Sequence, residues 1–222
     1  MTGLNWMNCR ARGDGWMSRS DAQSARASLD WSDGQVQYLP QWIDADLAEQ
    51  WLRKLLVQTP WAQPRLKLYG RTFAVPRQVA WYGDADAHYR YSGLTHTPLP
   101  WTPLLNEIRQ QLERQVGQPL NGVLLNLYRD GQDAMGWHSD DEAALGPDPL
   151  VVSLSLGAAR RLDFRRKGSS RIEHSIELEH GSLLVMGGST QHHWQHQIAR
   201  TRKVTAPRLN LTFRLIRNES DT

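Results

Sequence analysis

The sequence predicts an α+β protein whose core consists of two antiparallel β-sheets. Two amphipathic helical segments come first, and five β-rich runs separated by turn residues follow after Gly122. Short strands at this spacing are typical of a β-sandwich or barrel. Helices that precede such a run favour the α+β class over alternating βαβ units. The chain of 222 residues is long enough to bury the core of one domain.

The first half of the chain is predicted to contain a tail and two helices. Residues 1–30 mix Gly, Ser, Arg, Asp and Ala with little periodicity, so we expect a mobile tail there. The first helix is predicted over Asp44 to Leu56, where apolar residues recur at helical spacing after a capping aspartate. The second helix is predicted from about Pro103 to Gln115, where apolar residues again share one face.

The predicted strands lie in the runs VLLNLY, LVVSLSL, RLDFR, HSIELEHGSLLVMG and LNLTFRLI. Turn-forming clusters separate these runs, as expected for strands joined by short connections. We therefore expect residues 31–222 to form one domain, with the helices in residues 31–121 and the β core in residues 122–217.

Composition excludes several classes of protein. Cys9 is the only cysteine, so internal disulfides and zinc sites built from thiolates are ruled out. The longest apolar runs are too short for a membrane span, and the N-terminus lacks the apolar segment of a secretory signal. We therefore expect a cytoplasmic protein with no membrane partner.

The net charge of +3 conceals uneven segments. Residues 129–150 hold one arginine and six acidic residues, whereas residues 198–217 hold six basic residues and no acidic one. Residues 65–91 and 158–174 are also basic. This pattern fits either an ordinary solvated surface or a basic surface around an acidic pocket.

The acidic segment contains the run GWHSDDE, with His138 and Asp140 two residues apart. At the end of a strand, residues i and i+2 point to the same side. An imidazole and a carboxylate on one side supply two ligands of a facial triad, which is typical of non-haem Fe(II) sites. The motif alone is weak, because such tripeptides also occur in ordinary surface loops.

The third ligand would be a histidine from a distant strand. The run HHWQH places His192, His193 and His196 directly after a buried strand and a glycine pair. The chemistry of the residues does not choose among the three.

The run RLNLTFR alternates strictly between apolar and polar residues. Its polar face, which is either solvated or turned into a cleft, consists of Arg208, Asn210, Thr212 and Arg214. Two arginines on one strand face can hold a dicarboxylate through bidentate, charge-assisted hydrogen bonds. The earlier run NLY offers an amide and a phenol on one face, from Asn126 and Tyr128.

Together these pieces form the minimal equipment of an oxygenase that uses Fe(II) and 2-oxoglutarate. Their order also resembles the AlkB family of nucleic-acid dealkylases, in the runs NLYRDGQDAMGWHSDDEAALG, VSLSLGAARRLDFR and APRLNLTFR. The resemblance covers roughly Pro76 to Ile216. It implies a double-stranded β-helix (jelly-roll) core in residues 122–217, with helices and a nucleotide-recognition lid in residues 31–121.

The activity implied by the resemblance is oxidative dealkylation of N-alkylated bases such as 1-methyladenine and 3-methylcytosine. The reaction would use Fe(II), 2-oxoglutarate and O₂, and it would release succinate, CO₂ and formaldehyde. The implied partner is alkylated DNA, single- or double-stranded, with RNA as a further candidate. A monomer would suffice for this chemistry.

The resemblance also implies roles for individual residues. The iron ligands would be His138, Asp140 and His196. The residues around 2-oxoglutarate would be Asn126, Tyr128, Arg208, Asn210, Thr212 and Arg214. The flipped base would lie between Tyr91 and His138, with Glu142 at its exocyclic edge. The contacts to the nucleic-acid backbone would come from Arg71, Arg77, Arg161 and Arg165, and Tyr69 would be an aromatic finger.

Two other functions fit parts of the sequence. One is an oxygenase of the same kind that hydroxylates a protein or a small molecule. The other is a jelly-roll binding module without chemistry, which would bind no Fe(II). Basic segments that gather around His138 would favour nucleic acid over the other substrates.

Overall fold

Two antiparallel sheets pack face to face in the computed structural model, which describes residues 27–31, 33–68, 70–87, 89–91 and 94–217. The larger sheet contains β1 (Ala27–Trp31), β2 (Gly34–Leu39), β5 (Gln78–Gly83), β8 (Gly122–Tyr128), β10 (Val151–Gly157), β13 (Ser182–Gly187) and β15 (Arg208–Arg214). The smaller sheet contains β9 (Met135–His138), β11 (Arg160–Arg166), β12 (His174–Leu178) and β14 (Trp194–Ile198).

The strand orders are β1-β2-β13-β10-β15-β8-β5 in the larger sheet and β12-β11-β14-β9 in the smaller one. Neighbouring strands in both sheets are antiparallel, and many of them are far apart in the chain. This arrangement confirms the predicted α+β class with a double-stranded β-helix (jelly-roll) core.

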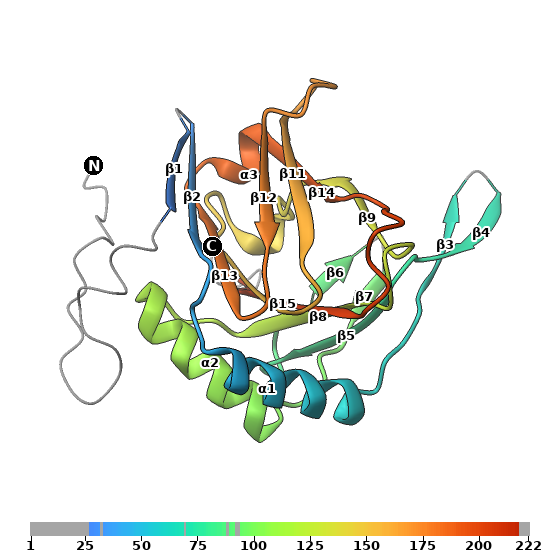
Figure 1. Ribbon diagram of the computed structural model, residues 1–222, viewed down its shortest axis with the longest axis vertical. Coiled ribbons are helices and arrows are strands. Elements are labelled where there is room, and N and C mark those ends of the chain that lie inside the picture. Colours follow the sequence, from blue (N-terminus) through green and yellow to red (C-terminus); the bar gives the residue numbers. More distant parts are fainter. Residues whose placement is uncertain (1–26, 32, 69, 88, 92–93, 218–222) are drawn as a thin grey trace.

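Two long helices, α1 (Ala45–Gln58) and α2 (Pro103–Val116), lie side by side across the outer face of the larger sheet (Figure 1). The carboxylate of Asp44 caps α1 by accepting a hydrogen bond from the Leu47 amide at 2.8 Å. Thr102 caps α2 in the same way, and Gly117 ends it in the left-handed conformation at φ 70°. Both helices were predicted, and each ends one or two residues later than expected. None of the helices in the described part of the chain has the length and apolar content that a bilayer crossing needs.

Most buried apolar side chains of the described residues lie in two layers, and a smaller cluster surrounds Trp81. The layer under the helices joins the buried faces of α1 and α2 to side chains of the larger sheet, including Leu209, Leu211 and Phe213 of β15. The layer between the sheets contains aromatic side chains. Trp31 packs there against Phe164 and Trp194, with ring centroids 4.7 Å and 4.6 Å away. Part of the chain's complement of ten tryptophans therefore serves as core packing.

The larger sheet extends beyond residues 122–217, to which the sequence analysis confined the β core. Strand β2 pairs with β13, and β5 pairs with β8, so each covers a strand that would otherwise be a sheet edge. Strand β1 pairs with β2 and begins at Ala27, inside the segment expected to be a tail. The rest of that segment, residues 1–26, lies outside the described residues.

The region predicted to be a lid contains two small hairpins. One consists of β3 (Arg65–Leu68) and β4 (Arg71–Ala74), and it projects from the body of the protein (Figure 1). The other consists of β6 (Tyr89–Tyr91) and β7 (Leu94–His96). Short strands of this kind were not predicted, because their runs carry no long periodic pattern.

Arg160 connects the loop between β8 and β9 to the loop after β14, and it gives a test of the fold. Its buried guanidinium donates hydrogen bonds to the carbonyls of Asp130, Asp133 and Ala199, at 3.1, 3.0 and 2.7 Å. We expect Arg160→Met to lower the free energy of unfolding by about 2–4 kcal/mol, because buried carbonyls lose their donors. Urea unfolding measures this change. The control is Arg53→Met, which removes an exposed pair with Glu49 on α1 and should cost less than about 1 kcal/mol. Equal effects of the two substitutions would contradict the structural role of Arg160.

Candidate active site

A pocket between the two sheets collects ten of the residues singled out from the sequence. They are Asn126, Tyr128, His138, Asp140, Glu142, His196, Arg208, Asn210, Thr212 and Arg214. These residues come from β8, β9, β14, β15 and the loop after β9. Antiparallel pairing of strands that are distant in the chain therefore brings the separate motifs together.

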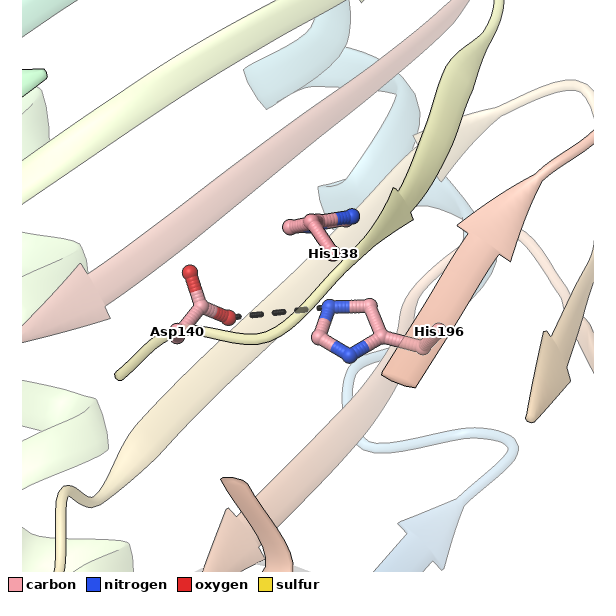
Figure 2. A group of neighbouring side chains, drawn as sticks. All are labelled: His138, Asp140 and His196. Atoms are coloured by element: carbon pink, nitrogen blue, oxygen red, sulfur yellow. Dashed lines mark ion pairs between the residues drawn. The ribbon is translucent and has the colours of Figure 1, made fainter. Parts of the chain in front are cut away.

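One wall of the pocket carries a His-Asp-His group. His138 ends β9, Asp140 follows in the next loop, and His196 lies on β14 directly opposite His138 (Figure 2). The candidate ligand atoms of the three side chains all lie within 4.8 Å of one another. The carboxylate oxygen Oδ2 of Asp140 is 3.6 Å from Nε2 of His196. This donor set and its geometry fit a facial triad for a non-haem iron.

The structure decides which of the three late histidines joins the group. His196 points inward from β14 and is 6% exposed. His192 and His193 belong to the short helix α3 (Thr190–His193), and both are exposed. In β14 the inward positions are Trp194, His196 and Ile198, so the period of two along the strand selects His196.

Charges around the group hold its members in the form that binds a metal. Burial alone would raise the pKa of Asp140, but the charge of Arg214 and the two histidines lower it to about 2. Burial and the neighbouring His138 lower the pKa of His196 to about 3. At neutral pH the site therefore offers a carboxylate and a neutral imidazole, and metal binding need not displace protons from these two side chains.

Hydrogen bonds outside the group orient its members. Nδ1 of His138 donates to the Gly136 carbonyl at 2.8 Å, which leaves Nε2 for a metal. The side-chain oxygen of Gln191, a fully buried residue, accepts from the Asp140 amide at 2.9 Å. The Ser139 hydroxyl donates to the Trp194 carbonyl at 2.8 Å. The sequence analysis missed both residues, although Ser139 lies within the run GWHSDDE and Gln191 directly precedes the run HHWQH.

Arg208 lines the pocket as a buried cation. It is 1% exposed, and its guanidinium carbon lies 5.2 Å from the centroid of the Tyr128 ring. Nη2 donates to the Ser155 hydroxyl at 2.9 Å, whereas Nε and Nη1 have no hydrogen-bond partner in the described part of the chain. Burial lowers the pKa of Arg208 to about 10, so the side chain remains charged at neutral pH. A buried cation with two unsatisfied donors fits a carboxylate ligand.

The rest of the polar face of β15 connects this position to the metal-binding group. Arg214 donates to the carboxylate of Asp140 through Nη2, and both side chains are buried. Between the two arginines, Thr212 donates to Asn210 at 3.0 Å, and Asn210 donates to Ser153 at 2.7 Å. The polar face therefore turns into a cleft, as one of the two interpretations predicted, and it is not a solvated edge.

The predicted base-binding residues are only partly described. Glu142 contributes to the pocket wall and precedes the short 3-10 helix η2 (Ala143–Leu145). Tyr91 ends β6, but its side chain lies outside the described residues. Tyr69 and the side chain of Arg71 also lie outside them. The roles expected of these three residues remain predictions.

The remaining backbone-contact candidates fall into two groups. Arg161 has an exposed guanidinium 2.8 Å from Asp163, and Arg165 stacks on the ring of Trp137 at 4.3 Å, so both are near the surface of the smaller sheet. Arg77 is instead 3% exposed, and its Nε donates to Asn126 at 2.7 Å. The prediction that Arg77 contacts phosphates is therefore wrong, because the side chain turns inward from the start of β5.

Sequence comparison agrees with this geometry. The model of the 2OG-Fe(II) oxygenase superfamily matches residues 35–214. A human protein named DNA oxidative demethylase ALKBH2 is 43% identical over 180 residues, which cover 78% of this chain and 69% of that protein. This chain belongs to the AlkB family. A second human member, named Alpha-ketoglutarate-dependent dioxygenase alkB homolog 3, is 38% identical over 80% of this chain and 64% of its own length.

Solved structures support the fold of this AlkB-family protein. A structure entitled "The structure of OsALKBH1" matches with a TM-score of 0.55 and 18% identity, over 85% of this chain and 99% of the other. An oxidoreductase of the 2OG-Fe(II) oxygenase family from Burkholderia pseudomallei matches with a TM-score of 0.53. As a 2OG-Fe(II) oxygenase, the AlkB-family protein uses Fe(II), 2-oxoglutarate and O₂, and the side chains of the pocket fit the metal and the dicarboxylate.

The neighbouring carboxylates Asp140 and Asp141 give a matched test of metal binding. We expect Asp140→Asn to weaken Mn(II) binding about 100-fold or more, because the buried group loses its anionic ligand. Equilibrium dialysis of the folded variant measures the affinity. The control is Asp141→Asn, since Asp141 pairs with Lys167 at the surface and should leave the affinity unchanged. Unchanged Mn(II) binding by Asp140→Asn would contradict the assignment.

Replacement of Arg208 tests the dicarboxylate site. We expect Arg208→Met to raise the KM for 2-oxoglutarate about 10-fold to 100-fold, because charge-assisted hydrogen bonds are lost. Arg208→Lys keeps the charge but loses the planar guanidinium with its paired donors. Its KM for 2-oxoglutarate should therefore lie between that of the unsubstituted protein and that of Arg208→Met. Steady-state kinetics with varied 2-oxoglutarate measures the effect. A KM for 2-oxoglutarate that is unchanged in Arg208→Met would exclude this residue as the carboxylate ligand.

Proposed function

We propose that this chain is a DNA oxidative demethylase that restores bases carrying methyl groups on ring nitrogens, of the 1-methyladenine and 3-methylcytosine type. The observation that carries the proposal is the 43% identity with the human protein named DNA oxidative demethylase ALKBH2. The buried His-Asp-His group and the orphaned Arg208 in one pocket support it, because the reaction needs a metal beside a bound dicarboxylate.

In this proposal the residues have separate tasks. His138, Asp140 and His196 bind Fe(II), and Arg208 binds the distal carboxylate of 2-oxoglutarate with help from Tyr128. Arg214, Asn210 and Thr212 form the wall near the other carboxylate, and Asn126 donates to the co-substrate. When bound, iron and 2-oxoglutarate use O₂ to hydroxylate the alkyl carbon, after which formaldehyde leaves the base and succinate and CO₂ are the other products.

The presence of Glu142 in the pocket wall supports a preference for a damaged base. A methylated ring nitrogen makes the base cationic, and a nearby carboxylate or aromatic face stabilises a cation. Glu142 supplies the carboxylate in the wall of the pocket. His138 and Tyr91 would flank a base that has left the stack.

Basic residues beside the pocket support a nucleic-acid substrate. Arg165 stacks on Trp137, the residue directly before His138, and Lys167 pairs with Asp141, directly after Asp140. These cations come from β11 and the residue after it, and they contact the sequence neighbours of the metal-binding residues. We propose single- or double-stranded DNA as the substrate, with RNA as a second polymer to be tested.

We further propose that the protein acts as a monomer in the cytoplasm. The pocket is built from one chain, so no second copy is required to complete it. The single cysteine suits a reducing compartment.

The decisive experiment uses the full chain with Fe(II), 2-oxoglutarate, ascorbate and oligonucleotides that carry 1-methyladenine or 3-methylcytosine. We expect the mass of one methyl group to be lost from single- or double-stranded DNA, with matched RNA tested in parallel. Asp140→Ala is the inactive control. Consumption of 2-oxoglutarate without loss of methyl from any oligonucleotide would contradict the proposal and would favour a protein or small-molecule substrate.

A further inference from the structure

Arg77 is a buried cation behind the wall of the pocket. It directly precedes β5, and its exposed fraction is 3%. In the described part of the chain it has no carboxylate partner, although buried arginines are usually paired with one. The mechanism outlined above does not use this side chain, so its burial needs a separate explanation.

The side chain of Arg77 binds the oxygen of the Asn126 side-chain amide, which lines the pocket. Its Nε donates to Oδ1 of Asn126 at 2.7 Å, and both residues are buried. Asn126 lies on β8, the central one of three neighbouring strands. It is paired with Val79 of β5 on one side and with Asn210 of β15 on the other. The backbone of Asn126 is therefore fixed by both neighbours, and rotation of the side-chain amide is its main remaining freedom.

The two ends of an amide have opposite effects on an anion. The NH₂ group donates to a carboxylate, whereas the carbonyl oxygen repels it. Because Arg77 binds the oxygen, the NH₂ group is the end left for the pocket. Nδ2 of Asn126 makes no hydrogen bond within the described part of the chain, so this donor is available to a ligand.

We propose that Arg77 is a positioning residue for 2-oxoglutarate, which holds the Asn126 amide with its donor end toward the co-substrate. This inference rests on the proposed contact between Asn126 and 2-oxoglutarate.

The test measures binding of 2-oxoglutarate to the full chain loaded with Mn(II), by calorimetry without nucleic acid or turnover. The variants are Arg77→Met, Asn126→Ala and the double substitution. We expect Arg77→Met to weaken binding about 5-fold to 30-fold, as for the loss of one oriented hydrogen bond. The double variant should bind no more weakly than Asn126→Ala, because Arg77 acts through Asn126. Arg77→Lys should recover part of the affinity.

Two controls separate positioning from folding. Arg53→Met removes an exposed arginine on α1 and should leave binding of 2-oxoglutarate unchanged. Asn126→Asp keeps a partner for Arg77 and should preserve the thermal stability, but it removes the donor and should weaken binding of 2-oxoglutarate. This second variant keeps the proposal falsifiable even if Arg77→Met fails to fold.

Three results would overturn the inference. The first is that the effects of Arg77→Met and Asn126→Ala on the binding free energy of 2-oxoglutarate are additive in the double variant. The second is that Asn126→Asp binds 2-oxoglutarate with unchanged affinity. The third is a raised KM for oligonucleotide in Arg77→Met with unchanged affinity for 2-oxoglutarate, which would assign Arg77 to the nucleic acid. Because binding is measured without a nucleic acid, failure of the demethylase proposal would leave this test unaffected.

Discussion

Successive side chains of β15 point to opposite faces of the larger sheet, and both faces are buried. Leu209, Leu211 and Phe213 pack under the helices, while the arginines and the residues between them face the smaller sheet. A register shift of one residue would exchange the two faces and bury the cations among leucines. The helices therefore have a chemical purpose as well as a structural one. By covering the apolar face, they allow the polar face to line a closed pocket between the sheets.

Within the residues that the structure describes, one of the two buried arginines of this pocket is paired with a carboxylate, and the other is not. Arg214 is neutralised by the carboxylate of Asp140, which also belongs to the metal-binding group. Arg208 has no such partner in the described part of the chain, and an uncompensated buried cation destabilises the folded protein. A dicarboxylate ligand compensates the charge of Arg208 when it binds. Part of its binding free energy therefore comes from relief of this destabilisation. The uncompensated charge of Arg208 also discriminates against neutral ligands, because they would leave the guanidinium without a charged acceptor.

Local patterns in the sequence predicted the parts of the site that lie within one strand or one turn. The alternation in RLNLTFR identified both faces of β15, and the spacing of His138 and Asp140 identified two members of the triad. The choice of His196 over its neighbours needed the resemblance or the structure, because it depends on where α3 ends and β14 begins. Arg77 was misassigned, and the strands β1, β2 and β5 were missed. Their roles depend on pairing between distant segments, and such pairing leaves no signal within a short window.

The position of β15 has a consequence for synthesis of the protein. It is the last strand of the described chain, yet it lies between β10 and β8 in the larger sheet. Pairing between segments so distant in sequence forms slowly, and a growing chain cannot begin it before its final strand has emerged. Such a chain already carries all three metal-binding side chains, but neither of the arginines that bind or adjoin the co-substrate. The residues that would hold 2-oxoglutarate are therefore complete only after β15 is inserted between β10 and β8. Among the described strands, the one that completes the co-substrate site is thus the last to be synthesised.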